Sequence, residues 1–188
     1  MFDKLEYSRY NSKVRLRGGK NMLLELGKII NCPGESVSFS TVVDLSDLKY
    51  GNCYPVTSPV LAEGTVRNTA GVLEMSGSIR TTIHGVCDRC AEEFTRDEDI
   101  PLSVVLVTEF ADDGNEDEWV FLLNGDCADL EEIVRTVFVL NMDSKLLCSE
   151  DCKGLCCRCG KNLNDGPCGC QKEPDPRFAA LRQLLDKE

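Results

Sequence analysis

Long apolar runs are missing from this 188-residue sequence. A membrane-spanning helix needs roughly 18 to 20 consecutive apolar residues, and no stretch approaches that length. The longest early apolar run, residues 22–24, is broken by Glu25 and Lys28, so we predict no secretory signal peptide either. We therefore expect a cytoplasmic protein without membrane contact, in a compartment where thiols stay reduced.

Positive charge is also scarce. The chain has 21 Lys and Arg residues against 32 Asp and Glu residues, which gives a formal net charge of -11. A surface with this much negative charge repels phosphate backbones. Sequence-independent binding to RNA or DNA therefore has a weak electrostatic basis. A basic protein partner is the better match.

Basic residues gather in a leader, residues 1–21, which holds six of them against two acidic residues. The leader is polar, has no apolar period and ends in Gly-Gly-Lys-Asn. We predict a flexible segment rather than a basic arm that touches nucleic acid. Because the segment LLELGKII follows Met22 directly, Met22 is an alternative natural start, and the leader need not be native.

Signatures of catalysis are scarce as well. The sequence has one histidine, no glycine-rich phosphate loop and no Ser-His-Asp nucleophile motif. That histidine, His84, lies on the polar side of a predicted strand, where we expect an exposed residue. The acidic run EFADDGNEDEW, residues 109–119, is predicted to be a solvated loop rather than a cation site or a pair of catalytic carboxylates. We expect a protein that is not an enzyme and has no small-molecule substrate.

Strand patterns account for much of what is present. Apolar Leu73, Met75 and Ile79 alternate with polar residues in the longest run, which predicts an antiparallel sheet with one face in water. The predicted strands fall within residues 36–45, 60–72, 71–87, 101–110 and 119–123, and the second of them ends in a turn signal at residues 68–71.

Two helices complete the predicted elements. Asp129 can cap the first, about 129–141. Asp175-Pro176 opens the second. Their inward stripes are Leu130, Ile133, Val134, Val137 and Phe138 in the first helix and Phe178, Leu181 and Leu185 in the second.

The fold that these elements predict is α+β and β-rich. With 42% hydrophobic residues the chain can supply one core. We expect a twisted antiparallel sheet or partial barrel with a packed helix in residues 22–146. A cysteine-rich zinc-binding module and a terminal helix should follow in residues 147–188.

Cysteine, in contrast, is abundant. Seven of the twelve cysteines lie within residues 147–170, whose only large apolar side chains are Leu147, Leu155 and Leu163. Burial of so little apolar surface cannot offset the entropy lost on ordering the segment. A four-thiolate zinc site can, since it contributes on the order of 10 to 16 kcal/mol of apparent folding free energy.

Spacing divides eight cysteines between two structural Zn²⁺ ions. Cys156 and Cys159 form a C-x2-C-G knuckle in which Gly160 can take a positive φ, and in Cys168-Gly169-Cys170 the glycine adds freedom to bring both sulfurs to one ion. Cys148 and Cys152 need two more ligands, which the C-x2-C pair at a predicted hairpin tip can supply. The predicted ligand sets are Cys156, Cys159, Cys168 and Cys170 for one ion, and Cys87, Cys90, Cys148 and Cys152 for the other.

Other readings of the cysteines stay open. Crossed pairings between the two sites are sterically possible. Disulfides, an iron-sulfur cluster and redox catalysis by Cys87 and Cys90 are rivals to zinc, and each is less well matched to the compartment or to the local sequence. Cys157 is the odd cysteine of the cluster, and Cys32, Cys53 and Cys127 are expected to be small buried or semi-buried residues.

Four segments together resemble the YceD family, the large ribosomal RNA subunit accumulation proteins of bacteria and plastids. The resemblance extends from about Met22 to the predicted terminal helix. It implies recurring cysteines at six positions of the C-terminal cluster and places Cys157 where proline is common. The segments are CDRCAEEF, LEEIVRTVFVLNM, LCSEDCKGLCCRCGKNLNDGPCGC and DPRFAALRQLL, and the six cysteines are Cys148, Cys152, Cys156, Cys159, Cys168 and Cys170.

The resemblance implies a role in 23S rRNA accumulation. Our first hypothesis is a non-enzymatic accessory factor for large-subunit assembly whose acidic surface binds a basic ribosomal protein or assembly factor. RNA contact is undecided, and its candidates are Arg89, Lys153, Arg158 and Lys161. The alternative is a redox- or zinc-responsive regulator that uses its cysteines as a switch, and an enzyme acting on rRNA ranks third.

Overall fold

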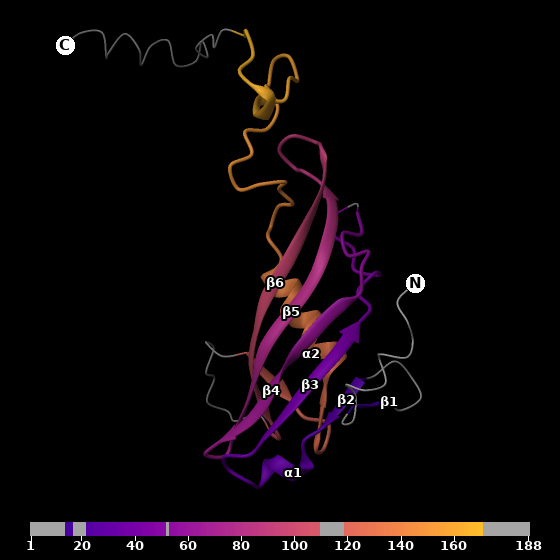
Figure 1. The fold of residues 1–188 in the computed structure, drawn as a ribbon, viewed down its shortest axis with the longest axis vertical. Helices are drawn as coiled ribbons and strands as arrows, with labels where there is room; N and C mark the ends of the chain where they lie inside the picture. Colours follow the sequence, from indigo (N-terminus) through magenta and orange to yellow (C-terminus); the bar gives the residue numbers. More distant parts are fainter. Residues whose placement is uncertain (1–13, 17–21, 52, 110–118, 171–188) are drawn as a thin grey trace, which may run out of the picture.

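The computed structural model describes residues 14–16, 22–51, 53–109 and 119–170. Two β-sheets, one long helix and a cysteine-rich C-terminal segment make up this part of the chain (Figure 1). The elements are β1 Val14–Leu16, β2 Met22–Glu25, α1 Gly27–Ile30, β3 Ser36–Val43, β4 Val60–Thr69, β5 Val72–Val86, β6 Glu93–Val107, β7 Val120–Leu122, β8 Cys127–Asp129, α2 Leu130–Asn141 and the 3-10 helix η1 Leu163–Asp165.

The larger sheet has the strand order β3-β4-β5-β6-β7. Its alternating pattern places apolar side chains on the inner face, where Met75, Ile79 and Leu102 are almost fully buried, and polar residues on the outer face. The predicted twisted antiparallel sheet is therefore confirmed for β3 to β6. Val37, Phe39 and Thr41 of β3 face the core.

A long hairpin of β5 and β6 extends beyond the rest of the sheet. The two strands pair from Leu73↔Leu106 to Val86↔Glu93, whereas the pairing of β4 with β5 stops at Leu61↔Arg80. Residues 81–98, which we call the arm, therefore extend past the last pair between β4 and β5, and the C-x2-C turn lies at the tip of the arm (Figure 1). The C-terminal module, residues 147–170, lies at the outer end of the arm.

The last strand of the sheet differs from the fully antiparallel prediction. β7 runs parallel to β6, with Val105 opposite Val120 and Val107 opposite Leu122. Two parallel neighbours need a connection of a dozen or so residues, and residues 108–119 provide one. Trp119 at its end is partly buried against the core.

The smaller sheet, in the order β1-β2-β8, leads directly into α2. Asp129 ends β8 and caps α2, since its side chain accepts hydrogen bonds from the backbone N–H groups of Glu131 and Glu132 at 3.1 and 3.3 Å. The predicted stripe is confirmed. Its buried side chains, which pack in one core with β2 and the inner face of the larger sheet, are Leu130, Ile133, Val134, Val137 and Phe138.

Three predictions about the ends and loops have different outcomes. The leader was predicted to be flexible, yet Val14–Leu16 pairs with β2 in an antiparallel register. The predicted helix after Asp175 and most of the acidic loop lie outside the described residues. Among the described helices, none has the length and apolar character needed to cross a membrane.

Candidate metal centre

A tight turn with a fixed hydrogen-bond pattern closes the arm. The backbone N–H of Cys87 donates to the carbonyl of Glu92 at 2.8 Å, and the N–H of Ala91 donates back to the carbonyl of Cys87 at 2.8 Å. Ala91 takes the left-handed φ of 60° that this turn requires. The predicted hairpin-tip position of Cys87 and Cys90 is confirmed.

The same turn recurs in the C-terminal module. Cys156 N–H donates to the carbonyl of Lys161 at 2.8 Å, and Gly160 N–H donates to the carbonyl of Cys156 at 2.9 Å. Gly160 has φ 72°, which confirms the positive φ predicted for it. Gly169, in contrast, has no positive φ, and a Cβ there would meet nothing within 4 Å. The added freedom predicted for Gly169 stays a prediction.

Two cysteines from the arm and two from the start of the module meet in a proximal tetrad, defined as Cys87, Cys90, Cys148 and Cys152. All four Sγ atoms lie within 4.8 Å of one another. The Sγ atoms of Cys87 and Cys152 are 3.7 Å apart, as are those of Cys90 and Cys148. Phe94 and Leu147 pack against this group, and Cys152 is only 4% exposed.

The distal tetrad, Cys156, Cys159, Cys168 and Cys170, is built within the module alone. Its four Sγ atoms also lie within 4.8 Å of one another, and those of Cys156 and Cys168 are 3.3 Å apart. Cys156, Cys168 and Cys170 are half-buried and Cys159 is exposed. The structure thus brings the eight cysteines together in the same two sets of four that the spacing predicts.

Backbone donors prepare one sulfur of each tetrad to carry charge. Burial raises the pKa of Cys87, but N–H groups of Cys148, Cys90 and Arg89 donate to its sulfur and lower the pKa to about 6. In the distal tetrad the N–H groups of Cys159 and Arg158 lower the pKa of Cys156 to about 6. Hydrogen bonds that favour a thiolate have this effect because they stabilise its negative charge.

Crowding has the opposite effect on other sulfurs. The backbone N–H of Glu92 favours the thiolate of Cys90, but burial and the neighbouring sulfurs outweigh it and raise the pKa to about 12. Cys159, followed by burial and Cys156, raises the pKa of Cys170 to about 12. Four thiols this close cannot all ionise unless a cation compensates their charge.

The donor set and spacing fit a tetrahedral ion bound by thiolates. Sulfurs placed about 2.3 Å from a central zinc form a tetrahedron whose edges are roughly 3.8 Å. The 3.7 Å separations in the proximal tetrad match that edge. A disulfide needs sulfurs about 2.05 Å apart, and all twelve cysteines, which fall within the described residues, are free. Both tetrads could hold metal ions.

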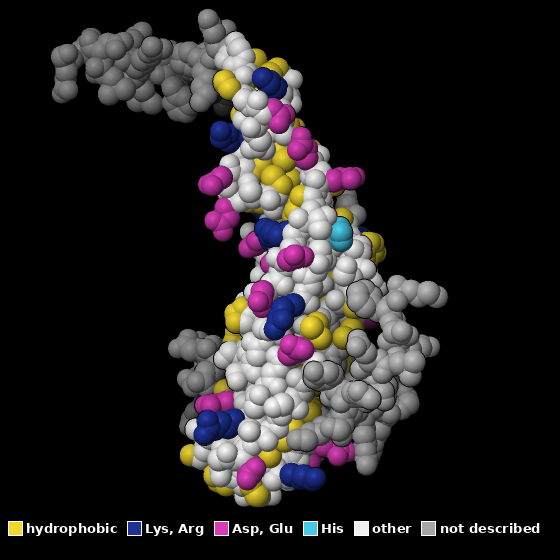
Figure 2. All heavy atoms as spheres, viewed as in Figure 1, with side chains coloured by type: hydrophobic (Ala, Val, Ile, Leu, Met, Phe, Trp, Pro, Cys, Tyr) yellow, Lys and Arg dark blue, Asp and Glu magenta, His cyan; other side chains and the backbone are white. Residues whose placement is uncertain are grey.

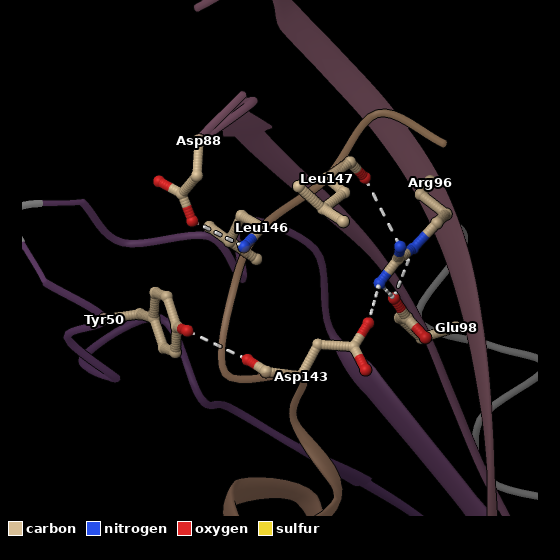
Figure 3. Close-up of polar contacts among 7 residues, drawn as sticks. All are labelled: Tyr50, Asp88, Arg96, Glu98, Asp143, Leu146 and Leu147. Atoms are coloured by element: carbon tan, nitrogen blue, oxygen red, sulfur yellow. Dashed lines mark hydrogen bonds and ion pairs between the residues drawn. The ribbon is translucent and has the colours of Figure 1, made fainter. Parts of the chain in front are cut away.

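Hydrogen bonds that the sequence did not reveal join the module, and Leu146 just before it, to the arm. Asp88 N–H donates to the carbonyl of Leu146, and Leu146 N–H donates to Oδ2 of Asp88, each at 2.8 Å (Figure 3). Nη1 of Arg89 donates to the carbonyls of Glu150 and Cys152, both at 3.1 Å. The two middle residues of the C-x2-C turn therefore dock the segment that carries Cys148 and Cys152.

Arg96 fixes the path of the chain between α2 and the proximal tetrad (Figure 3). Its guanidinium donates to Glu98 at 2.7 Å, to Asp143 at 3.1 Å and to the carbonyl of Leu147 at 3.3 Å. Tyr50 donates its hydroxyl to the carbonyl of Asp143 at 2.9 Å. Burial lowers the pKa of Arg96, but Glu98 and Asp143 raise it by more, so its charge is secure.

The remaining predicted cysteines and the histidine lie outside both tetrads. His84 is exposed, and its Nδ1 is 2.9 Å from the hydroxyl of Thr95. Cys157 is exposed, and Cys53 and Cys127 are half-buried as predicted. Cys32 is exposed, so its predicted burial is wrong, because it lies in the turn that follows α1.

The predicted contact residues are all at the outer end of the molecule. Lys153, Arg158 and Lys161 are exposed. Nζ of Lys161 donates to the carbonyl of Pro167 at 3.1 Å, and Arg89 is engaged in docking the module. Their contact with a partner or RNA stays a prediction.

Fold and site together define a β-sheet protein whose projecting hairpin carries a module with two four-cysteine clusters. The family model described as "Large ribosomal RNA subunit accumulation protein YceD" matches residues 75–185. The chain belongs to the YceD family, which confirms the resemblance seen in the sequence.

Curated relatives agree with this assignment. The protein "Large ribosomal RNA subunit accumulation protein YCED homolog 1, chloroplastic" of Arabidopsis thaliana is 26% identical over 163 residues, covering 71% of this chain and 51% of its own. The protein of the same name in Zea mays is 29% identical, covering 61% and 49%. An uncharacterized protein of Mycobacterium tuberculosis is 28% identical, covering 63% and 58%.

The chain spans about half the length of the curated relatives it matches. No solved structure matches it.

Proposed function

We propose that this protein is a non-enzymatic accessory factor for large-subunit assembly that supports 23S rRNA accumulation and carries one structural zinc ion in each tetrad. The family name implies a role in the accumulation of large-subunit ribosomal RNA. Membership of the family is the observation that carries the proposal. The two cysteine tetrads support the second part of the proposal, that structural zinc ions hold the binding surface in place.

Structural rather than catalytic zinc follows from the donor sets. A catalytic zinc keeps a coordination position open for water or substrate, whereas four thiolates close the site. Each tetrad supplies four sulfurs within 4.8 Å of one another. The ions would therefore hold the module rigid on the arm, and the surface they support would bind the partner.

Charge favours a basic protein as that partner. Glu93, Asp97 and Asp99 are exposed at alternating positions along the outer face of β6, and Glu150 and Asp151 are exposed on the module. Figure 2 shows acidic side chains along this part of the molecule. An acidic surface attracts a basic ribosomal protein or assembly factor at long range. Lys153, Arg158 and Lys161 would add local contact with RNA phosphates.

Deletion and complementation test the proposal. We expect a strain lacking the gene to have a lower ratio of large-subunit to small-subunit rRNA, measured by quantitative electrophoresis of total RNA. The wild-type gene and the control variant Cys157→Ser, which alters the cysteine outside both tetrads, should restore the ratio. Cys87→Ser and Cys156→Ser should not. An unchanged ratio after deletion, with growth otherwise impaired, would overturn the proposal.

A second candidate function, a redox- or zinc-responsive switch, is favoured by one observation. Cys159 of the distal tetrad is exposed, so an oxidant can reach a ligand directly. A switch should release zinc at a low dose of peroxide and change its partner, whereas a structural site should keep its metal until the chain unfolds. Zinc release and partner binding, followed together during peroxide titration, separate the two functions.

A further inference from the structure

Asn164 belongs to the distal half of the module, but its side chain reaches the proximal tetrad. It lies in η1, within the loop that joins Cys159 to Cys168. Its Nδ2 donates to Sγ of Cys152 at 3.3 Å. Its Oδ1 accepts a hydrogen bond from the backbone N–H of Lys153 at 2.8 Å. Because only the amide oxygen can accept from an N–H, this second bond fixes which end of the amide faces the sulfur.

The sulfur that Asn164 contacts is a buried member of the proximal tetrad. Cys152 is only 4% exposed, and the Asn164 amide donates a hydrogen bond to its sulfur from the neighbouring loop. Groups that hydrogen-bond a metal ligand in this way orient it and tune its affinity for the metal.

The distal tetrad determines where Asn164 sits. The loop of residues 160–167 starts at the Cys156 turn and ends at Cys168, so the distal sulfurs hold both of its ends. Every residue of the loop is half-buried or exposed, and Leu163 is its only large apolar side chain. The loop meets the proximal segment through Leu163 N–H, which donates to the carbonyl of Gly154 at 2.9 Å. Apolar burial is thus too small to order the loop without help.

We propose that Asn164 couples the two metal sites. Metal in the distal tetrad orders the loop, the loop presents Asn164 to Cys152, and the proximal tetrad then binds its ion more tightly. Asn164 is a positioning residue in this scheme, since it acts through a ligand and not on the metal. The coupling rests on metal binding by both tetrads, which is part of the proposed function.

Linkage fixes a second property of the coupling. If metal at the distal site raises proximal affinity by some factor, metal at the proximal site must raise distal affinity by the same factor. Loss of a group that supports a metal ligand typically lowers affinity about 10- to 100-fold. We expect Asn164→Ala to lower proximal zinc affinity by about 10-fold, at the lower end of that range.

A thermodynamic cycle on the full chain tests the coupling. Zinc affinity of each site is measured by competition with a chromophoric chelator, and native mass spectrometry gives the number of ions bound. Asn164→Ala should weaken the proximal site when the distal site is loaded. In a chain whose distal site is removed by Cys156→Ser and Cys168→Ser, the proximal site should already be weak, and Asn164→Ala should change it little further.

Two variants separate the sulfur contact from a general role in docking the loop. Asn164→Asp keeps the shape and the acceptor for Lys153 but faces the thiolate with a negative oxygen, so it should weaken the proximal site at least as much as Asn164→Ala. Lys161→Met removes a different bond from the same loop, the one that Nζ donates to the carbonyl of Pro167 at 3.1 Å, and should have a smaller effect.

A chain that lacks the proximal site serves as the control for an effect of Asn164→Ala on folding. With Cys87→Ser and Cys90→Ser in place, Asn164→Ala should leave distal zinc affinity unchanged, because no proximal metal remains to which the Cys152 contact could couple the distal site.

The coupling would be overturned if the chain binds two zinc ions, and the affinity of each site changes neither with Asn164→Ala nor with removal of the other site. That result would leave the proposed function standing. A folded chain that binds no zinc at either site would overturn both.

Discussion

Ala91 and Gly160 occupy equivalent positions in two turns with the same hydrogen bonds, yet only one of them is glycine. A left-handed backbone costs an alanine about 1 to 2 kcal/mol. Part of this is offset by the greater freedom of glycine in the unfolded chain. We expect Ala91→Gly to raise the free energy of unfolding by about 0.5 to 1 kcal/mol and Gly160→Ala to lower it by a similar amount. Urea denaturation in excess zinc measures both.

Gly169→Ala is the matched control, since position 169 has an ordinary φ and open space around a Cβ. It should leave stability almost unchanged. A destabilising Ala91→Gly would contradict the equivalence of the two turns.

Arg96 gives a second prediction at the residue scale. Its guanidinium contacts a carboxylate on each side and a backbone carbonyl, and its side chain is 30% exposed. We expect Arg96→Ala to lower the free energy of unfolding by about 1 to 2 kcal/mol because it leaves Glu98 and the Leu147 carbonyl without their charged donor. Differential scanning calorimetry and urea denaturation measure the change.

Arg80→Ala serves as its control. Arg80 meets Glu63 at 3.5 Å on the outer face of the sheet, with both side chains about half exposed, and such pairs contribute roughly 0 to 1 kcal/mol. Equal losses from the two variants would argue against an anchoring role for Arg96.

Spacing predicted which cysteines gather but not what supports them. C-x2-C turns are local, so the pairs Cys87 with Cys90 and Cys156 with Cys159 can be read directly from the sequence. Asn164 and Arg89 could not be recognised as supports. Their partner atoms belong to segments that only the tertiary fold brings near, such as Cys152, which is 63 positions beyond Arg89.

At the scale of elements, the cap of α2 gives the clearest prediction. Asp129 accepts from two backbone N–H groups at the start of the helix. Replacing such a cap with alanine costs about 0.5 to 2 kcal/mol, so Asp129→Ala should lower the free energy of unfolding by about 1 kcal/mol. Asp129→Asn keeps a side-chain acceptor and should retain most of the stability. Urea denaturation that finds both variants equal to wild type would contradict the cap.

The elements themselves were largely predictable, and their partners less so. Alternation identified β3, β4 and β5, and the 3.6-residue stripe identified α2, because both patterns record which side chains are buried. The parallel direction of β7 and the pairing of Val14–Leu16 with β2 could not be derived. Strand direction depends on the path of the connection, and three residues are too few to carry a pattern.

At the scale of the whole molecule, two different forces hold two parts of the chain. Buried apolar residues from both sheets and α2 form one core, whereas residues 147–170 have sulfur clusters and few apolar contacts. Chelation should therefore release the module and leave the core folded.

Limited proteolysis with mass spectrometry checks this separation. After chelation, cleavage should appear within residues 147–170 while β3 to β6 and α2 stay protected, and added zinc should restore protection. Cleavage of the core at the same rate as the module would show that the two parts are not held independently.

The account depends most directly on metal in the two tetrads. Native mass spectrometry of the folded protein, purified without added metal, counts the bound ions. The account predicts a mass equal to that of the chain plus two zinc ions, falling to one ion in Cys156→Ser with Cys168→Ser. A folded chain that carries no metal, with residues 147–170 still protected from protease, would contradict it.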